Sequence, residues 1–142
     1  CPNWEDDRLG SFQGLKPYHG ANDRYLSVME GILFNLYQCY KILVSAKGQP
    51  QRIKLSGGIL NSERWSQMCA DIFGFDMEVD QVEHSSLLGS VTLGLELLGC
   101  IEDATDFKTQ KVKTIKANLE TKDLYHQKYQ KYLHWYEALS HL

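Results

Sequence analysis

Several features that would define a function directly are missing from this chain of 142 residues. No apolar run approaches the roughly 20 residues that a transmembrane helix needs. No Gly-Lys-Ser or Gly-Lys-Thr step occurs, which excludes a P-loop nucleotide site. The four cysteines form no Cys-x-x-Cys pair, so the spacing of a structural zinc site or a disulfide scaffold is absent. We expect a cytoplasmic protein with no metal ligands and no membrane partner.

Size and charge narrow the class further. A chain of 142 residues is long enough for one domain with a packed core, and 43% hydrophobic and 23% charged residues are typical of globular proteins. The formal net charge of −3 provides no basic footprint for nucleic acid. Lysines gather between Lys108 and Lys122, but acidic residues alternate with them, as on a solvated surface. We therefore predict no nucleic-acid partner.

The segment 52–65 has the pattern of a strand, a glycine turn and a helix start. Ile53 and Leu55 alternate with polar residues, as in a short, half-buried strand. Gly57 and Gly58 follow, and neither carries a Cβ. The backbone can therefore turn sharply here, and another group can approach it closely.

Two residues after this turn can cap the next helix, which carries Trp65 and ends at Gly74. Asn61 or Ser62 offers a side-chain oxygen to its first N–H groups. A glycine turn that leads into a helix N-terminus suits a nucleotide phosphate or a ribose edge. A double glycine before a helix also occurs in βα turns that bind nothing, and the third glycine of the dinucleotide fingerprint is missing. The residues alone leave both interpretations open.

The rest of the chain alternates helices with short strands. Strands are predicted at 11–13 and 77–79, and helices at 22–46 and 85–99, with a last helix after a polar stretch at 102–120. Asn22 is expected to cap the first helix, and Gly48 to stop it. The pattern predicts a helix-rich α/β or α+β domain with a small, incomplete sheet.

Two of the predicted helices carry a continuous stripe of large side chains at steps of three or four residues. The stripe of the 22–46 helix is predicted to be buried and consists of Tyr25, Val28, Ile32, Leu36, Cys39 and Leu43. The stripe of the last helix is interpreted as a packed face rather than a base-stacking surface, and consists of Tyr125, Tyr129, Tyr132 and Tyr136.

Five short blocks occur in an order that resembles one known family. Residues 1–4 resemble the end of a Gly-Glu-Arg-x-Pro-x-Trp loop, and 10–15 resemble a Gly-x-Phe-x-Gly-Leu turn. Residues 28–36 contain the Glu-Gly step of a long helix, 56–74 resemble an adenosine-binding turn and its helix, and 85–89 resemble a Ser-Ser-Ala-Leu-Gly segment. Each block is weak alone, but the ordered set resembles the C-terminal domain of the FGGY family of carbohydrate kinases.

The resemblance implies the actin-like, ribonuclease-H-like ATPase fold, with residues 1–142 as part of its C-terminal, ATP-binding domain. It implies transfer of the γ-phosphoryl group of ATP, with Mg²⁺, to a hydroxyl of a sugar or sugar acid. Gly57 and Gly58 resemble the pair whose backbone faces adenosine and the α-phosphate, and Ser62 or Asn61 lies where relatives place a residue near adenine. The catalytic aspartate and the phosphate loops are expected upstream of Cys1, so no catalytic residue is assigned.

The same resemblance indicates the partners. The N-terminal sugar-binding domain is expected to be absent from this chain, so the fragment alone should be inactive, and a homodimer is possible. Phe-Asn-Leu at 34–36 is most similar to gluconate kinases, with xylulose kinases and other pentulose or polyol kinases next. Asp71 is expected to be solvated or to cap backbone groups. A non-catalytic interaction module and an actin-like ATPase switch are the alternatives from other classes.

Overall fold

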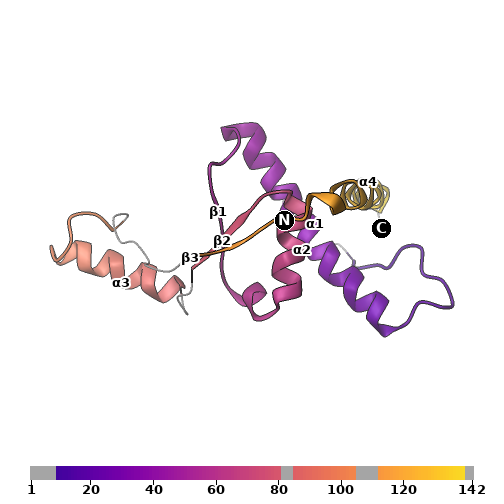
Figure 1. The fold of residues 1–142 in the computed structure, drawn as a ribbon, viewed down its shortest axis with the longest axis horizontal. Coiled ribbons are helices and arrows are strands. Elements are labelled where there is room, and N and C mark those ends of the chain that lie inside the picture. Colours follow the sequence, from indigo (N-terminus) through magenta and orange to yellow (C-terminus); the bar gives the residue numbers. More distant parts are fainter. Residues whose placement is uncertain (1–8, 81–84, 105–111, 140–142) are drawn as a thin grey trace.

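The structure is a computed structural model that describes residues 9–80, 85–104 and 112–139 (Figure 1). The elements, in chain order, are α1 (Ala21–Lys47), β1 (Ile53–Leu55), the 3₁₀ helix η1 (Gly58–Asn61), α2 (Glu63–Phe73), β2 (Met77–Asp80), α3 (Ser85–Leu97), β3 (Val112–Ile115), the 3₁₀ helix η3 (Leu119–Thr121) and α4 (Lys122–Ala138). The strand predicted at 11–13 is wrong, because residues 9–20 contain no strand. The block at 1–4 lies outside the described residues.

The three strands form one sheet in the order β1-β2-β3. Strand β1 is parallel to β2, with Ile53 opposite Met77, and β3 is antiparallel to β2, with Ile115 opposite Met77. The small sheet confirms the predicted fold class, but the polar stretch predicted at 102–120 contains β3. Polar residues such as Lys113 and Thr114 concealed this strand, which backbone pairing with β2 holds in place.

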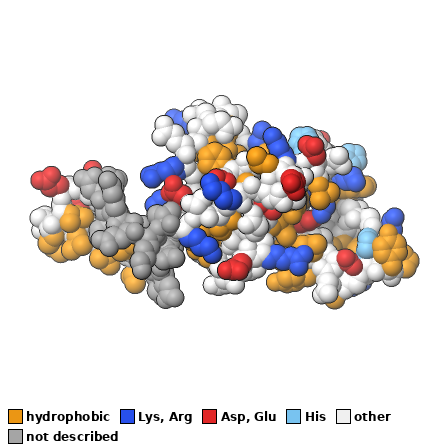
Figure 2. Space-filling view, viewed as in Figure 1, with side chains coloured by type: hydrophobic (Ala, Val, Ile, Leu, Met, Phe, Trp, Pro, Cys, Tyr) orange, Lys and Arg blue, Asp and Glu red, His pale blue; other side chains and the backbone are white. Residues whose placement is uncertain are grey.

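The core lies around α2, which packs against α1, α4 and strand β3 (Figure 1). Its buried apolar side chains come from these three helices and from β2: Leu33, Phe34, Met68, Cys69, Ala70, Ile72, Met77 and Tyr129. Helix α3 extends away from the other elements and carries exposed leucines. Figure 2 shows positive and negative side chains interleaved on the face in view, with no large patch of one sign.

Helix α1 is apolar on two sides, and the structure buries the side that the sequence analysis did not select. Leu33 and Phe34 are buried, and Leu26, Met29 and Tyr37 pack beside them. The predicted stripe is mostly exposed, with Tyr25 at 71%, Val28 at 46%, Ile32 at 45%, Leu36 at 47% and Leu43 at 64% exposure. The prediction of the buried face was wrong because periodicity cannot choose between two apolar faces of one helix.

The ends of α1 differ slightly from the prediction. The helix begins at Ala21, one residue before Asn22, and Asp23 Oδ2 accepts a hydrogen bond from the Gly20 N–H at 2.8 Å. Its carboxyl end is at Lys47, followed by Gly48 as predicted. The carboxylate of Asp23 in the first turn satisfies a backbone donor and complements the helix dipole.

The tyrosine stripe of α4 is a packed face, as predicted. The Tyr129 ring is buried and lies 4.9 Å from the Tyr37 ring centre and 5.9 Å from that of Phe34, both on α1. Beside these rings, Lys128 Nζ lies 2.6 Å from Glu30 Oε1, so an ion pair also joins α4 to α1. Among the described residues, none of the helices has the length and apolar character to cross a membrane.

The cysteines provide a test of this core. Burial raises the pKa of the Cys69 thiol to about 12, whereas Cys100 is exposed. Because the thiolate is the reactive form, we expect a thiol reagent at pH 8 to modify Cys100 rapidly and Cys69 only after denaturant is added. Mass spectrometry of the peptides that contain Cys69 and Cys100 measures both rates. In Cys100→Ser, the labelled form of the peptide that contains residue 100 should be absent. Equal rates at the two cysteines in the native chain would contradict the described core.

Candidate functional site

The glycine turn lies at the carboxyl end of β1. Because β1 and β2 are parallel, Leu55 and Val79 are paired near the same edge of the sheet, and the turn at Gly57 projects beyond that edge. Ligands of open α/β sheets bind outside the carboxyl ends of the parallel strands. The position of the turn therefore agrees with a binding role, and the sequence prediction of strand, turn and helix is confirmed.

The two glycines of this turn have different conformations. Gly57 has φ 85° and ψ −161°, a region that is essentially restricted to glycine. Gly58 starts η1 without a positive φ, and a Cβ built on it would meet no atom within 4 Å. Gly57 is thus needed to turn the chain, whereas Gly58 exposes bare backbone to open space that a side chain would fill.

The sequence left Asn61 and Ser62 as alternative caps, and the structure selects Ser62. Its Oγ accepts a hydrogen bond from the Trp65 N–H at 3.3 Å, while its backbone is extended. Asn61 ends η1, is exposed, and its side chain makes no hydrogen bond within the described part of the chain. Of the four residues predicted to bind the nucleotide, Gly57 and Ser62 therefore also shape the turn, and Gly58 and Asn61 are open to solvent.

Two contacts that sequence analysis missed anchor this turn. The Ser66 hydroxyl on α2 donates to the Ile59 carbonyl at 2.9 Å, and the Trp65 indole N–H donates to the Met29 carbonyl on α1 at 3.4 Å. The Ile59 side chain packs against the core. Sequence patterns do not reveal these contacts, because Met29 and Trp65 are 36 residues apart and the bond from Ser66 to Ile59 crosses from α2 to η1.

The start of α2 carries charges of both signs, with Glu63 first and Arg64 second. Glu63 occupies the first helical position, and its side chain is 94% exposed and 3.8 Å from Lys113 Nζ. An acidic residue in the first turn stabilises the helix through its dipole, and it also repels an anionic ligand at the same place. Arg64 and Lys113 offset the charge of Glu63, so the N-terminus of α2 has no excess of positive side-chain charge that would favour phosphate over a neutral part of a ligand.

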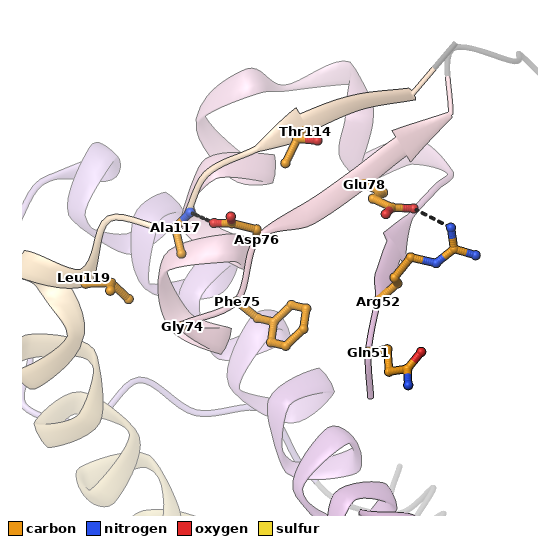
Figure 3. A pocket seen from close by; sticks show the side chains of 9 residues that line it. All are labelled: Gln51, Arg52, Gly74, Phe75, Asp76, Glu78, Thr114, Ala117 and Leu119. Atoms are coloured by element: carbon orange, nitrogen blue, oxygen red, sulfur yellow. Dashed lines mark hydrogen bonds and ion pairs between the residues drawn. The ribbon is translucent and has the colours of Figure 1, made fainter. Parts of the chain in front are cut away.

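A depression of about 500 Å³ lies at the opposite edge of the sheet (Figure 3). It is lined by residues that precede β1 and β2, among them Arg52, Phe75 and Asp76. Its charges are already paired: Arg52 lies 4.0 Å from Glu78, and Asp76 accepts from Lys116 at 2.6 Å and from the Ala117 N–H at 3.0 Å. These bonds hold the pKa of Asp76 below its usual value. The depression therefore lies at the amino ends of the parallel strands β1 and β2 and offers paired charges to a ligand.

Asp71 has a capping role and is not solvated. Its carboxylate is buried and accepts hydrogen bonds at 2.8 Å from the Asn118 N–H and from the Gln67 side chain, which also donates to the Lys116 carbonyl. The prediction that Asp71 caps backbone groups agrees with this geometry, and the alternative of a solvated side chain is wrong. Among the described residues, no three His, Cys, Asp or Glu side chains group as metal ligands.

Comparison with solved structures identifies the class of fold. A solved xylulose kinase from Lactobacillus acidophilus, with ligand bound, shares the fold with a TM-score of 0.81 at 28% identity, over 92% of this chain and 27% of that one. A gluconate kinase from the same organism gives a TM-score of 0.79 at 29% identity, with the same coverage of each chain. The fold is therefore that of the actin-like, ribonuclease-H-like ATPases.

Sequence comparison agrees with the structural one. The profile for the C-terminal domain of the FGGY family of carbohydrate kinases matches residues 1–96. Gluconokinase from Bacillus subtilis (strain 168) is 37% identical over 103 residues, which are 72% of this chain and 20% of that protein. The chain belongs to the FGGY family of carbohydrate kinases, and it spans between 20% and 27% of the length of these relatives.

The two glycines predict opposite effects on stability. Gly57→Ala should lower the free energy of unfolding by about 1–3 kcal/mol, because alanine must adopt the glycine-only conformation. Gly58→Ala should leave it unchanged or raise it by up to about 1 kcal/mol, because the added methyl group meets open space and the unfolded chain loses freedom. Urea unfolding followed by circular dichroism measures both. A loss for Gly58→Ala equal to that for Gly57→Ala would show that the described turn is incorrect.

Proposed function

We propose that this chain is part of the ATP-binding domain of a sugar kinase, which transfers the γ-phosphoryl group of ATP to a hydroxyl of a sugar or sugar acid. The observation that carries the proposal is the bare backbone at Gly58, which faces open space beyond the carboxyl end of β1. Membership of the FGGY family supports the reaction class. The turn offers what a nucleotide needs: close approach to backbone groups without an intervening side chain.

The nucleoside end of ATP is the part that this turn fits best. Arg64 and Lys113 offset the charge of Glu63 at the start of α2, and the Trp65 N–H there is already bonded to Ser62. A phosphate would find no excess of positive side-chain charge at this helix end, whereas a ribose or purine edge is neutral and needs none. We therefore assign Gly57 and Gly58 to the backbone surface under adenosine, with Asn61 as the side chain that reaches the base and Ser62 beside it.

ATP with Mg²⁺ would supply the phosphoryl group and the charge stabilisation that such transfers require. The residues of this chain bind and orient the nucleoside, because the turn holds backbone groups in one fixed conformation. We assign no catalytic aspartate and no metal ligand to the described residues. Those groups belong to the remainder of the kinase, so the isolated chain should have no activity.

The remainder of a longer kinase chain is the proposed partner. The chain spans only 20% of the B. subtilis gluconokinase. Its α1 exposes an apolar face that includes Val28, Ile32 and Leu36. A contiguous exposed apolar face of this kind marks an interaction surface, and the missing part of the kinase is the partner that the relatives' length supports.

Gluconate is the substrate that we favour, with xylulose as the alternative. Support comes from 37% identity to a gluconokinase over 103 residues, compared with 31% to a xylulose kinase from Staphylococcus epidermidis over 134 residues and 36% to one from Escherichia coli (strain K12) over 77 residues. The solved gluconate and xylulose kinases are nearly equal in TM-score. Since the sugar site lies largely outside this chain in our proposal, the preference rests on sequence similarity alone.

A substrate panel tests the proposal. The full-length kinase that contains this chain should couple ADP release to gluconate in preference to xylulose, glycerol, fuculose and rhamnulose. The isolated 142-residue chain is the matched control and should release no ADP above background with any of them. Preference for xylulose would replace the substrate but keep the reaction. Neither activity nor ATP binding in the full-length protein would support a non-catalytic interaction module.

Substitution of Gly58 tests the site itself. In the full-length kinase, Gly58→Val should raise the KM for ATP by roughly tenfold or more, because its side chain fills the space assigned to adenosine. The KM for the sugar should change less than twofold, since the sugar binds elsewhere. Steady-state kinetics with each substrate varied in turn separates the two constants. A larger effect on the sugar constant would reject this site.

A further inference from the structure

The Ile59 carbonyl is the point at which the glycine turn is tied to α2. It accepts a hydrogen bond from the Ser62 N–H at 3.3 Å and a second one from the Ser66 hydroxyl at 2.9 Å. Ser66 is only 2% exposed, so water cannot readily replace its hydroxyl. The Ile59 side chain packs against the core. Ile59, the residue that follows Gly58, is therefore held by both its carbonyl and its side chain.

The remaining bonds of the turn do not replace this tie. The Leu60 N–H donates to the Gly57 carbonyl at 3.0 Å, which closes the 3₁₀ turn but connects it only to itself. The Ser62 side chain caps α2 from the next residue along the chain. Among the described residues, the Ser66 hydroxyl is the side-chain group of α2 that donates to a backbone group within η1. The Trp65 indole joins the start of α2 to α1 instead. The Ser66 bond therefore helps to fix the direction in which Gly58 faces solvent.

We propose that Ser66 is a positioning residue for nucleotide binding, which acts through the Ile59 carbonyl to hold the Gly58 backbone in its ligand-ready conformation. The inference rests on the proposed function, since it concerns the same turn. A neutral hydrogen bond in a buried site contributes modestly to binding when it organises the site in advance. Its loss should therefore weaken ATP binding without affecting the sugar.

The test uses Ser66→Ala in the full-length kinase. Alanine removes one oxygen from a buried position and keeps the helix. We expect the KM for ATP to rise roughly threefold to tenfold, with the KM for the sugar unchanged. The matched control is Ser45→Ala, because the Ser45 hydroxyl makes the same kind of bond, to the Ile42 carbonyl at 2.8 Å, on the exposed end of α1. That variant should leave both constants unchanged.

The outcomes separate this inference from the proposed function. Unchanged constants in Ser66→Ala, alongside a raised KM for ATP in Gly58→Val, would overturn the role of Ser66 and keep the kinase. An equal rise in both constants with a lower melting temperature would assign Ser66 a structural role only and also overturn the proposal. If the alanine variant does not fold, the test uses Ser66→Cys, which fills a similar volume with a poor hydrogen-bond donor. The same comparison of the KM for ATP with the KM for the sugar then applies. Absence of ATP-dependent activity in the unmodified enzyme would reject both.

Discussion

Burial of α2 is the constraint on which the other contacts depend. Met68, Cys69, Ala70 and Ile72 are all buried on this helix, and α2 contacts α1, α4, η1, η3 and β3. A helix of 11 residues is marginal in isolation, so its stability comes from this packing. The packing of α2 therefore also fixes the positions of the segments that contact it. The glycine turn is one of those segments, because its two serine contacts originate on or beside α2.

The two ends of α2 serve opposite edges of the sheet. Its amino end holds the turn that follows β1, through Ser62 and Ser66. Its carboxyl end holds the segment after β3, through the bond from the Asn118 N–H to Asp71. Helix α2 therefore connects the glycine turn to the segment that follows β3. The depression of about 500 Å³ is lined by charges that are already paired, whereas the glycine turn exposes backbone groups. The groups that are exposed, and not the volume of the depression, therefore distinguish the candidate site.

Local signals in the sequence were sufficient to predict the glycine turn and most elements. Gly57 and Gly58, the cap at Ser62 and the stop at Gly74 depend on conformations of neighbouring residues, which the chain encodes within a few positions. The contacts that were missed are non-local or cross a turn. Strand β3 depends on backbone pairing with β2, and the bond from Ser66 to Ile59 depends on how η1 folds back over α2.

The sequence by itself determined the family, the glycine turn and the helical character of α1. Only the tertiary structure decided which side of α1 is buried. Leu33 is fully buried and Ile32, its neighbour, is 45% exposed, although either residue belongs to an apolar stripe. Helical periodicity reports that a stripe exists, but the energy of burial depends on the partner surface, and α2 and α4 meet only one side. Long-range packing therefore decided which of the two apolar faces of α1 is buried, because helical periodicity does not distinguish them.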